Sequence, residues 1–299
     1  MSRILAALFL LSAAGLAAQE IALTFDDLPR HGALPPSVTR VQIARDLVAA
    51  LKAANAPETY GFMNAQRIEQ DESGAEVLRI WRDGGLLLAS HSYSHMSLHA
   101  NPAEAFKEDI ERNEAAVAGL MQGQDWHWFR YPQLREGNTL EKRHAIRAYL
   151  NEKGYRVAQV TLDFEDYLWN GPYARCMAHG NTEAIAELKA SYLDVAMQYI
   201  EFGQQLSQIL FHRDIKHVML LHTGAFNALM LPDLLKLLDR MNFRLIPLGE
   251  AHDDLAYSSD PDIATERGET LLEQLMTAKN LQFPPHQEKP INQLGRMCR

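Results

Sequence analysis

The chain has 299 residues, of which 47% are hydrophobic, and a formal net charge of −9. This negative charge argues against non-specific binding to nucleic acid or to an anionic surface, although it says little about a neutral partner. A chain of this length and apolar content suits one large domain with a sizeable core better than two small domains.

Residues 1–18 have the features of a secretory signal peptide. Arg3 supplies a positive charge, Ile4 to Leu11 form an apolar core, and small residues follow up to Ala18. The apolar core is too short to cross a bilayer as a stable helix, and no later segment is long and apolar enough to do so. We expect cleavage near Ala17 or Ala18 and a periplasmic or secreted protein. A frayed N-terminal helix is the alternative.

Short apolar runs alternate with helical patterns along the rest of the chain. Strands are expected at 21–25, 59–63, 86–90, 126–129, 156–162, 217–221 and 243–248. Helices are expected at 37–54, 75–83, 101–121, 140–150, 182–211 and 232–241, with a loop at 171–180. Such alternation is typical of a parallel sheet with helical crossovers, and roughly seven or eight units in one domain suggest a barrel.

The end of the chain differs in composition from the rest. After about residue 257 the sequence becomes polar and contains prolines, with a helix expected near 264–278 and an irregular tail after it. We therefore divide the chain into a main domain at 19–257 and a C-terminal extension at 258–299. Cys176 and Cys298 could form a disulfide in an oxidising compartment and tie this tail to the middle of the chain; two separate free thiols are the alternative.

Two adjacent carboxylates end the first expected strand. The run from Ile21 to Phe25 is apolar and leads directly into Asp26 and Asp27. Two acids this close repel each other, and a metal ion is a common way to compensate their charge. An acidic turn after a strand is the alternative, and other motifs in the chain are needed to choose between a metal site and such a turn.

Two histidines follow the third expected strand with the spacing of a ligand pair. His91 and His95 are four positions apart, and on a turn of helix such positions share a face. With one carboxylate of Asp26 or Asp27 they give two His and one Asp, a three-ligand set typical of catalytic zinc. The second carboxylate can then accept a proton from a water that the metal activates. Surface histidines are the alternative.

Other polar residues end later strands. His222 could protonate a leaving group, or it could be a buried structural histidine. Arg130, Asp163 and Asp166 end two further strands. An arginine beside an acid can orient that acid and set its pKa, or the two can form a structural ion pair.

Five of these strand-end segments occur in the order of a known set of motifs. They are Thr24–Asp27, His91–His95, Arg130–Pro132, Asp163–Tyr167 and Leu220–His222. Together they resemble the motifs of the polysaccharide deacetylase family, the NodB homology domain of carbohydrate esterase family 4. The resemblance covers about residues 20–250. It implies an α/β fold, a distorted (β/α)7 barrel, and metal-dependent hydrolysis of acetyl groups from sugars.

The resemblance implies catalytic roles for four residues. Asp26 matches the family's catalytic base and His222 its catalytic acid. Arg130 matches the residue that orients the base. Asp166 matches the acid of the fourth motif, which assists the catalytic histidine or the arginine.

The resemblance also implies ligands for one divalent metal, usually zinc, and positions that contact the substrate. The implied metal ligands are Asp27, His91 and His95. The implied substrate contacts are Tyr167, Gln133 with its backbone N–H as an oxyanion donor, and Leu221 as an apolar residue that lines the acetyl pocket.

The chain departs from the family pattern in four places. Leu28 and then Pro29 follow the acid pair, where the family commonly has Gly. Tyr167 stands where Trp is usual, and Gln133 where Tyr is frequent. The segment 170–216 is longer than a simple crossover, and loops at this face shape the substrate groove.

The expected function is therefore metal-dependent removal of acetyl groups from an acetylated sugar or polysaccharide, N-acetyl rather than O-acetyl. Its expected partner is the acetylated glycan, with no nucleic acid. One alternative is an amidohydrolase that acts on a small non-sugar amide. Another is a catalytically silent sugar-binding protein, against which the complete set of two Asp and three His residues argues.

Overall fold

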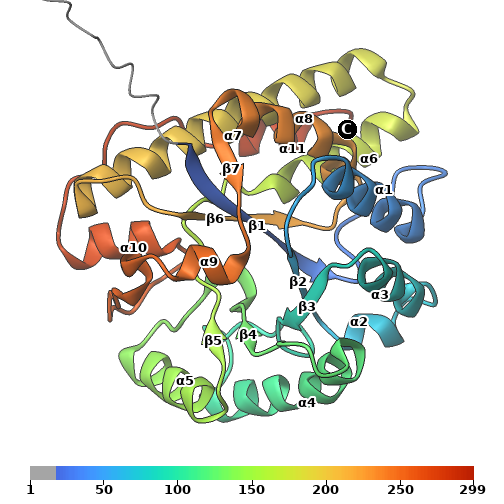
Figure 1. Ribbon diagram of the computed structural model, residues 1–299. Helices are drawn as coiled ribbons and strands as arrows, with labels where there is room; N and C mark the ends of the chain where they lie inside the picture. Colours follow the sequence, from blue (N-terminus) through green and yellow to red (C-terminus); the bar gives the residue numbers. More distant parts are fainter. Residues whose placement is uncertain (1–17) are drawn as a thin grey trace, which may run out of the picture.

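The computed structural model describes residues 18–299. The predicted signal peptide, residues 1–18, therefore lies almost entirely outside the described residues. Strands occupy the centre of the fold and helices surround them (Figure 1). Across residues 18–299, none of the helices combines the length and the apolar character that a membrane crossing requires.

Over the described residues the sheet has seven strands, and every pair is parallel. They are β1 (Gln19–Leu28), β2 (Tyr60–Met63), β3 (Leu87–Ser90), β4 (Trp128–Phe129), β5 (Arg156–Val157), β6 (His217–His222) and β7 (Phe243–Leu245). The order is β5-β4-β3-β2-β1-β6, and β7 pairs with the start of β1. Beyond β5, Leu162 bridges to Met219 of β6 and brings the two ends of the sheet together. The distorted (β/α)7 barrel expected from the sequence is confirmed.

β1 is the central strand of the barrel and pairs with β2, β6 and β7. Its residues from Ile21 to Leu28 are all buried, as expected for a parallel strand that is covered on both faces. In the pairing of β1 with β6, Asp26 lies beside His222. The register of the barrel therefore brings two predicted catalytic residues together.

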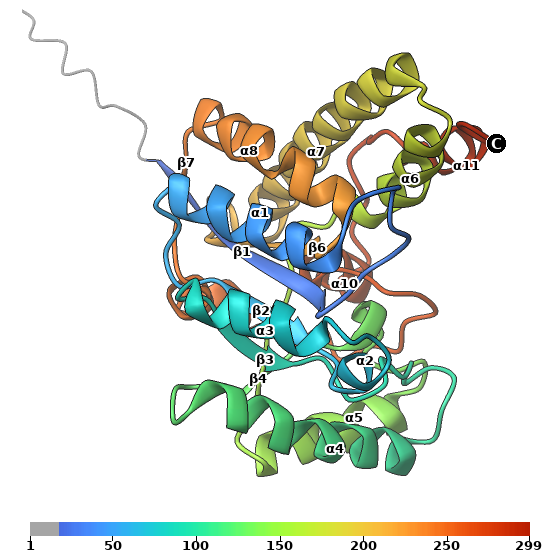
Figure 2. The same ribbon diagram turned by 90° about the vertical axis from the view of Figure 1, so that its right-hand side faces the viewer.

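Helices cover the outside of the barrel, as both views show (Figures 1 and 2). They are α1 (Arg40–Ala53), α2 (Gln66–Glu69), α3 (Gly74–Asp83), α4 (Ala103–Met121), α5 (Leu140–Glu152), α6 (Asn170–Ala178), α7 (Thr182–Phe211), α8 (Ala225–Arg240), α9 (Leu248–His252), α10 (Leu271–Ala278) and α11 (Ile291–Arg296). The long helix α7 packs against α6, α8 and α10.

Several element ends differ from the sequence expectations. The helix expected from 37 begins at Arg40, because the Thr39 side chain accepts a hydrogen bond from the Gln42 amide and caps it. The strand expected at 156–162 pairs regularly only as far as Val157. The strand expected at 243–248 ends at Leu245, and α9 follows it.

Three helices in the second half also differ from expectation. The loop expected at 171–180 contains α6, whose Pro172 lies in the first turn, where a helix needs no N–H from it. The helix expected at 232–241 begins at Ala225 and contains Pro232. The helix expected at 264–278 begins at Leu271, where Thr270 and Glu273 form a reciprocal capping box.

A disulfide between Cys176 and Cys298 joins α6 to the end of the chain, with the two Cα atoms 5.1 Å apart. The pairing expected from the sequence is confirmed. Arg175 strengthens the same contact, since it donates hydrogen bonds to the carbonyls of Leu294 and Met297. The tail with α11 therefore lies beside α6 (Figure 2).

Candidate active site

The two adjacent acids at the end of β1 have different partners. Asp26 accepts a hydrogen bond from Arg130 Nη1 at 3.2 Å. Burial raises the pKa of Asp26 to about 7, although the charge of Arg130 opposes this shift. Asp27 contacts His31 Nδ1 through Oδ2 at 2.6 Å and Arg67 Nη1 through Oδ1 at 2.8 Å. Burial favours a higher pKa for Asp27, but the His31 hydrogen bond and the charge of Arg67 outweigh burial and hold it well below the ordinary value.

The three predicted metal ligands lie together. Asp27 Oδ1 is 3.3 Å from His95 Nε2 and 3.8 Å from His91 Nε2. Within residues 18–299 this carboxylate oxygen is buried and, apart from its ion pair with Arg67 Nη1 at 2.8 Å, has no hydrogen-bond partner. A buried carboxylate oxygen that accepts no hydrogen bond, next to two imidazole nitrogens, is a donor set that suits a metal site. These residues therefore fit one divalent cation.

The backbone fixes the orientation of His91. Its Nδ1 donates a hydrogen bond to the carbonyl of Arg130 at 2.8 Å, which leaves the Nε2 lone pair facing Asp27. Burial and the neighbouring His95 lower the pKa of His91 well below its ordinary value. The imidazole is thus held neutral, the form that binds a metal.

His222 and Asp166 form a second oriented pair. Asp166 Oδ1 is 2.7 Å from His222 Nδ1, and its Oδ2 accepts a hydrogen bond from the His222 amide at 2.8 Å. Burial lowers the pKa of His222, but the charge and hydrogen bond of Asp166 outweigh it and raise the pKa to about 9. An imidazole held in this way presents a proton on Nε2, away from Asp166.

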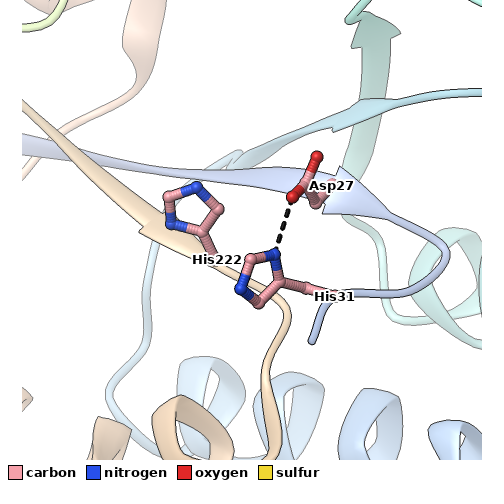
Figure 3. Close-up of side chains that lie close together, drawn as sticks. All are labelled: Asp27, His31 and His222. Atoms are coloured by element: carbon pink, nitrogen blue, oxygen red, sulfur yellow. Dashed lines mark hydrogen bonds and ion pairs between the residues drawn. The ribbon is translucent and has the colours of Figure 1, made fainter. Parts of the chain in front are cut away.

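His31 also lies in the site, although no role was predicted for it from the sequence. Its ring lies 4.7 Å from the ring of His222, and its Nδ1 contacts Asp27 (Figure 3). Asp27, His31 and His222 also form a second group with the geometry to hold a metal ion. The signal was present in the sequence, because His31 follows Asp27 at the same four-residue spacing that drew attention to His91 and His95.

One pocket of about 510 Å³ joins these groups, a volume typical of small-ligand sites. Gln133 and Tyr167 lie in its wall. Leu220 lines the pocket in place of Leu221, whose side chain is fully buried in the core. Neighbouring side chains on a strand point to opposite faces, so the assignment of Leu221 is corrected by one residue.

Five residues that line the pocket have left-handed backbone conformations. The φ angles are +71° for Asp27, +62° for His95, +60° for Gln133, +57° for Glu165 and +53° for Leu134. This region is uncommon for residues other than Gly, and such residues concentrate at functional sites where the surrounding structure holds them. The sequence gives no sign of these conformations.

The C-terminal extension reaches the same pocket. Arg267 and Gly268 line it, and a Cβ at Gly268 would lie 1.9 Å from the Gln133 carbonyl oxygen, so only Gly permits this close packing. From the tail, Lys289 forms an ion pair with Glu165, another residue of the pocket wall, at 3.0 Å. The extension is therefore part of the wall around the candidate site.

The family profile for polysaccharide deacetylases matches residues 14–158. This part of the chain belongs to the polysaccharide deacetylase family. The matched range contains Asp26, Asp27, His91, His95 and Arg130, and it ends before Asp166 and His222. A comparison with curated proteins finds no significant match.

Solved structures of the family share this fold. The chitin deacetylase of the fungal pathogen Colletotrichum lindemuthianum has a TM-score of 0.52 at 20% identity, over 79% of this chain and 88% of that one. The polysaccharide deacetylase Bc1974 of Bacillus cereus has a TM-score of 0.52 at 18% identity, over 77% and 91%. BA3943 of Bacillus anthracis, a family 4 pseudoenzyme, has a TM-score of 0.53 at 12% identity, over 78% and 65%. At these identities the likeness establishes the fold alone.

Proposed function

We propose that this family member is a metal-dependent hydrolase that removes acetyl groups from an acetylated sugar or polysaccharide. The observation that carries the proposal is the convergence of three ready-made groups on one pocket. These are the buried Asp27 Oδ1 beside His91 and His95, the Asp26–Arg130 pair, and the His222–Asp166 pair. A binding protein would have no use for all three.

The proposed metal is one divalent cation, most simply Zn²⁺, held by Asp27, His91 and His95. When bound, it polarises the acetyl carbonyl and promotes ionisation of water. Two His and one Asp with an open position are a donor set that suits catalytic zinc.

The chain's own residues supply the proton transfers. Asp26, held by Arg130, accepts the proton of the attacking water. Gln133 lines the pocket, and its backbone N–H is the proposed donor to the developing oxyanion. His222, oriented by Asp166, protonates the leaving atom. An amine needs such a proton in order to leave, so we propose an N-acetyl group rather than an O-acetyl group as the substrate.

We also propose that the chain is exported and that residues 19–257 form the catalytic domain, with 258–299 as an extension. Support for export comes from the leader-like composition of residues 1–18 and from the Cys176–Cys298 disulfide, a bond typical of oxidising compartments.

The test combines metal analysis of the purified protein with acetate release from a panel of N- and O-acetylated oligosaccharides. Acetate release by metal-loaded protein from an N-acetylated member supports the proposal. Bound metal with no acetate from any glycan favours the small-amide hydrolase, and neither metal nor acetate favours a silent binding protein.

A further inference from the structure

Three arginines line a second pocket beside the catalytic one. This pocket has a volume of about 400 Å³, and its wall contains Arg30, Arg40 and Arg67. It shares Asp27 and His31 with the catalytic pocket, so the two cavities adjoin each other at these residues. The β1–α1 loop supplies Arg30, His31 and Gly32 to this pocket, and the sequence leaves its family's pattern at the start of the same loop.

Backbone carbonyls hold two of these arginines in place. Arg40 donates from Nη1 to the carbonyl of His31 and from Nη2 to that of Gly32, both at 2.5 Å. Arg67 Nη1 donates to the carbonyl of Arg30 at 2.8 Å. Carbonyl partners fix the position of a guanidinium but do not neutralise its charge.

Few acids balance the three positive charges. Within residues 18–299, neither Arg30 nor Arg40 has a carboxylate at ion-pair distance, and the ion pair of Arg67 is with Asp27, the residue that fits the metal. Asp71 is near enough to Arg40 and Arg30 to interact by charge. Its Oδ1, however, already accepts hydrogen bonds from the amide and the hydroxyl of Ser73.

Hydrogen-bond donors also remain free. A guanidinium has five N–H donors and no acceptor. In the described part of the chain Arg30 makes one side-chain hydrogen bond, from Nη2 to Gln70 Oε1 at 2.9 Å. Arg40 Nε is buried there and has no partner. The pocket thus offers fork-shaped positive donors, the arrangement that best matches a planar or tetrahedral oxyanion.

We propose that this pocket is a subsite for an anionic oxygen group of the substrate, a carboxylate or a sulfate ester. The substrate is then an acidic glycan, whose charged sugar sits in the arginine pocket while the acetylated sugar sits in the catalytic pocket. This proposal rests on the proposed function of the catalytic pocket, with which it shares Asp27 and His31.

Binding to Zn²⁺-loaded Asp26→Asn protein tests the subsite without turnover. The probes are a β-1,4-linked tetramer of N-acetylglucosamine and two derivatives of it, one oxidised to the carboxylate at C6 and one sulfated at C6. At least one charged tetramer should bind about tenfold more tightly than the neutral one, as expected for charge-assisted contacts. This preference should shrink at high salt.

Arg30 provides the discriminating variants, because its side chain, unlike those of Arg40 and Arg67, donates no hydrogen bond to a backbone carbonyl in the described residues. Arg30→Gln, on the same background, should remove the preference for the charged probe and leave the neutral tetramer unaffected, whereas Arg30→Lys should keep part of the preference. Arg45→Gln removes one positive charge from an exposed site of α1 outside the pocket, where Arg45 pairs with Glu76, and should change nothing. This matched control separates a local subsite from the net charge of the protein.

Each outcome decides the proposal. Equal binding of the three tetramers, no binding of any of them, or a preference that survives Arg30→Gln overturns it. The better of the two charged probes identifies the source of the anion. If the acetate-release panel is negative but binding depends on charge and on Arg30, the proposed function fails and the subsite stands.

Discussion

The two halves of the chain contribute differently to the candidate site. Residues 18–158 are built from regular strand–helix units, fall within the family match, and bring in Asp27, His91 and His95. Residues 159–299 contain the long α7, the disulfide and the extension, and bring in Asp166 and His222. The first half holds the proposed metal ligands and the proposed base, whereas the second half holds the proposed acid and much of the pocket wall. We therefore expect mutations to separate metal binding from protonation of the leaving group.

The largest expected effect tests this separation from the second half. His222→Gln should lower kcat for acetate release by about 10²- to 10⁴-fold, the usual contribution of a positioned general acid. Metal content should stay unchanged, because His222 lies outside the Asp27–His91–His95 group. His212→Gln, at an exposed position after α7, is the control. A loss of metal in His222→Gln would show that the Asp27–His31–His222 group binds the cation instead.

Removal of the disulfide tests whether the second half can be destabilised without an effect on metal binding by the first half. Replacing both Cys176 and Cys298 with Ser should lower the free energy of unfolding by about 2–4 kcal/mol, because the cross-link restricts the unfolded chain. Urea unfolding measures this, and a reductant should shift wild type by a similar amount. Metal affinity should not change. If the double variant loses metal as well, the two halves are not independent.

His31 contacts Asp27 of the first half and His222 of the second half. Because it is not one of the proposed metal ligands, its removal should weaken metal binding without abolishing it. His31→Phe keeps a ring beside His222 but removes the Nδ1 contact with Asp27. It should weaken metal affinity by about 10- to 100-fold, as is usual when a partner of a ligand is lost. Competition with a chelator measures the affinity. An unchanged affinity would mean that Arg67 alone positions the Asp27 carboxylate.

A further expected effect concerns stability in acid. Burial lowers the pKa of His217 to about 4 and that of His252 to about 3, below the roughly 6.5 of an unfolded histidine. Below pH 6.5 both histidines therefore become protonated in the unfolded chain while they stay neutral in the folded chain. Stability present at pH 7 is lost as the pH falls toward 4, by about 1.4 kcal/mol per pH unit for each histidine.

Urea unfolding between pH 7 and 4 checks this prediction. His217→Gln should show a shallower loss of stability with falling pH than wild type does. Equal slopes for the two proteins would mean that His217 does not resist protonation in the folded state.

The sequence predicted well those features that depend on local pattern. Apolar runs that stop at polar residues located the ends of β3 and β6 to within one residue, whereas β1 continues three residues past its expected end, to Leu28. Parallel strands place such ends at one edge. For this reason Asp26, Asp27, His91, His95 and His222 could be expected to meet in one site.

Features set by the path of the chain could not be predicted. The contact of Arg67 with Asp27 joins residues 40 positions apart and follows from how α2 packs beside the β1–α1 loop. Leu220 rather than Leu221 faces the pocket, a one-residue difference that strand alternation makes decisive. The close packing of Gly268 depends on how the extension folds back over Gln133, and this path cannot be predicted from the composition of the chain.

The central claim is that two adjacent acids have different tasks, Asp26 as base and Asp27 as metal ligand. The most direct test measures zinc content and acetate release for Asp26→Asn and Asp27→Asn in parallel. The account predicts that Asp26→Asn keeps its zinc and loses nearly all turnover, whereas Asp27→Asn loses both. Full turnover in Asp26→Asn, or full zinc content in Asp27→Asn, would contradict it.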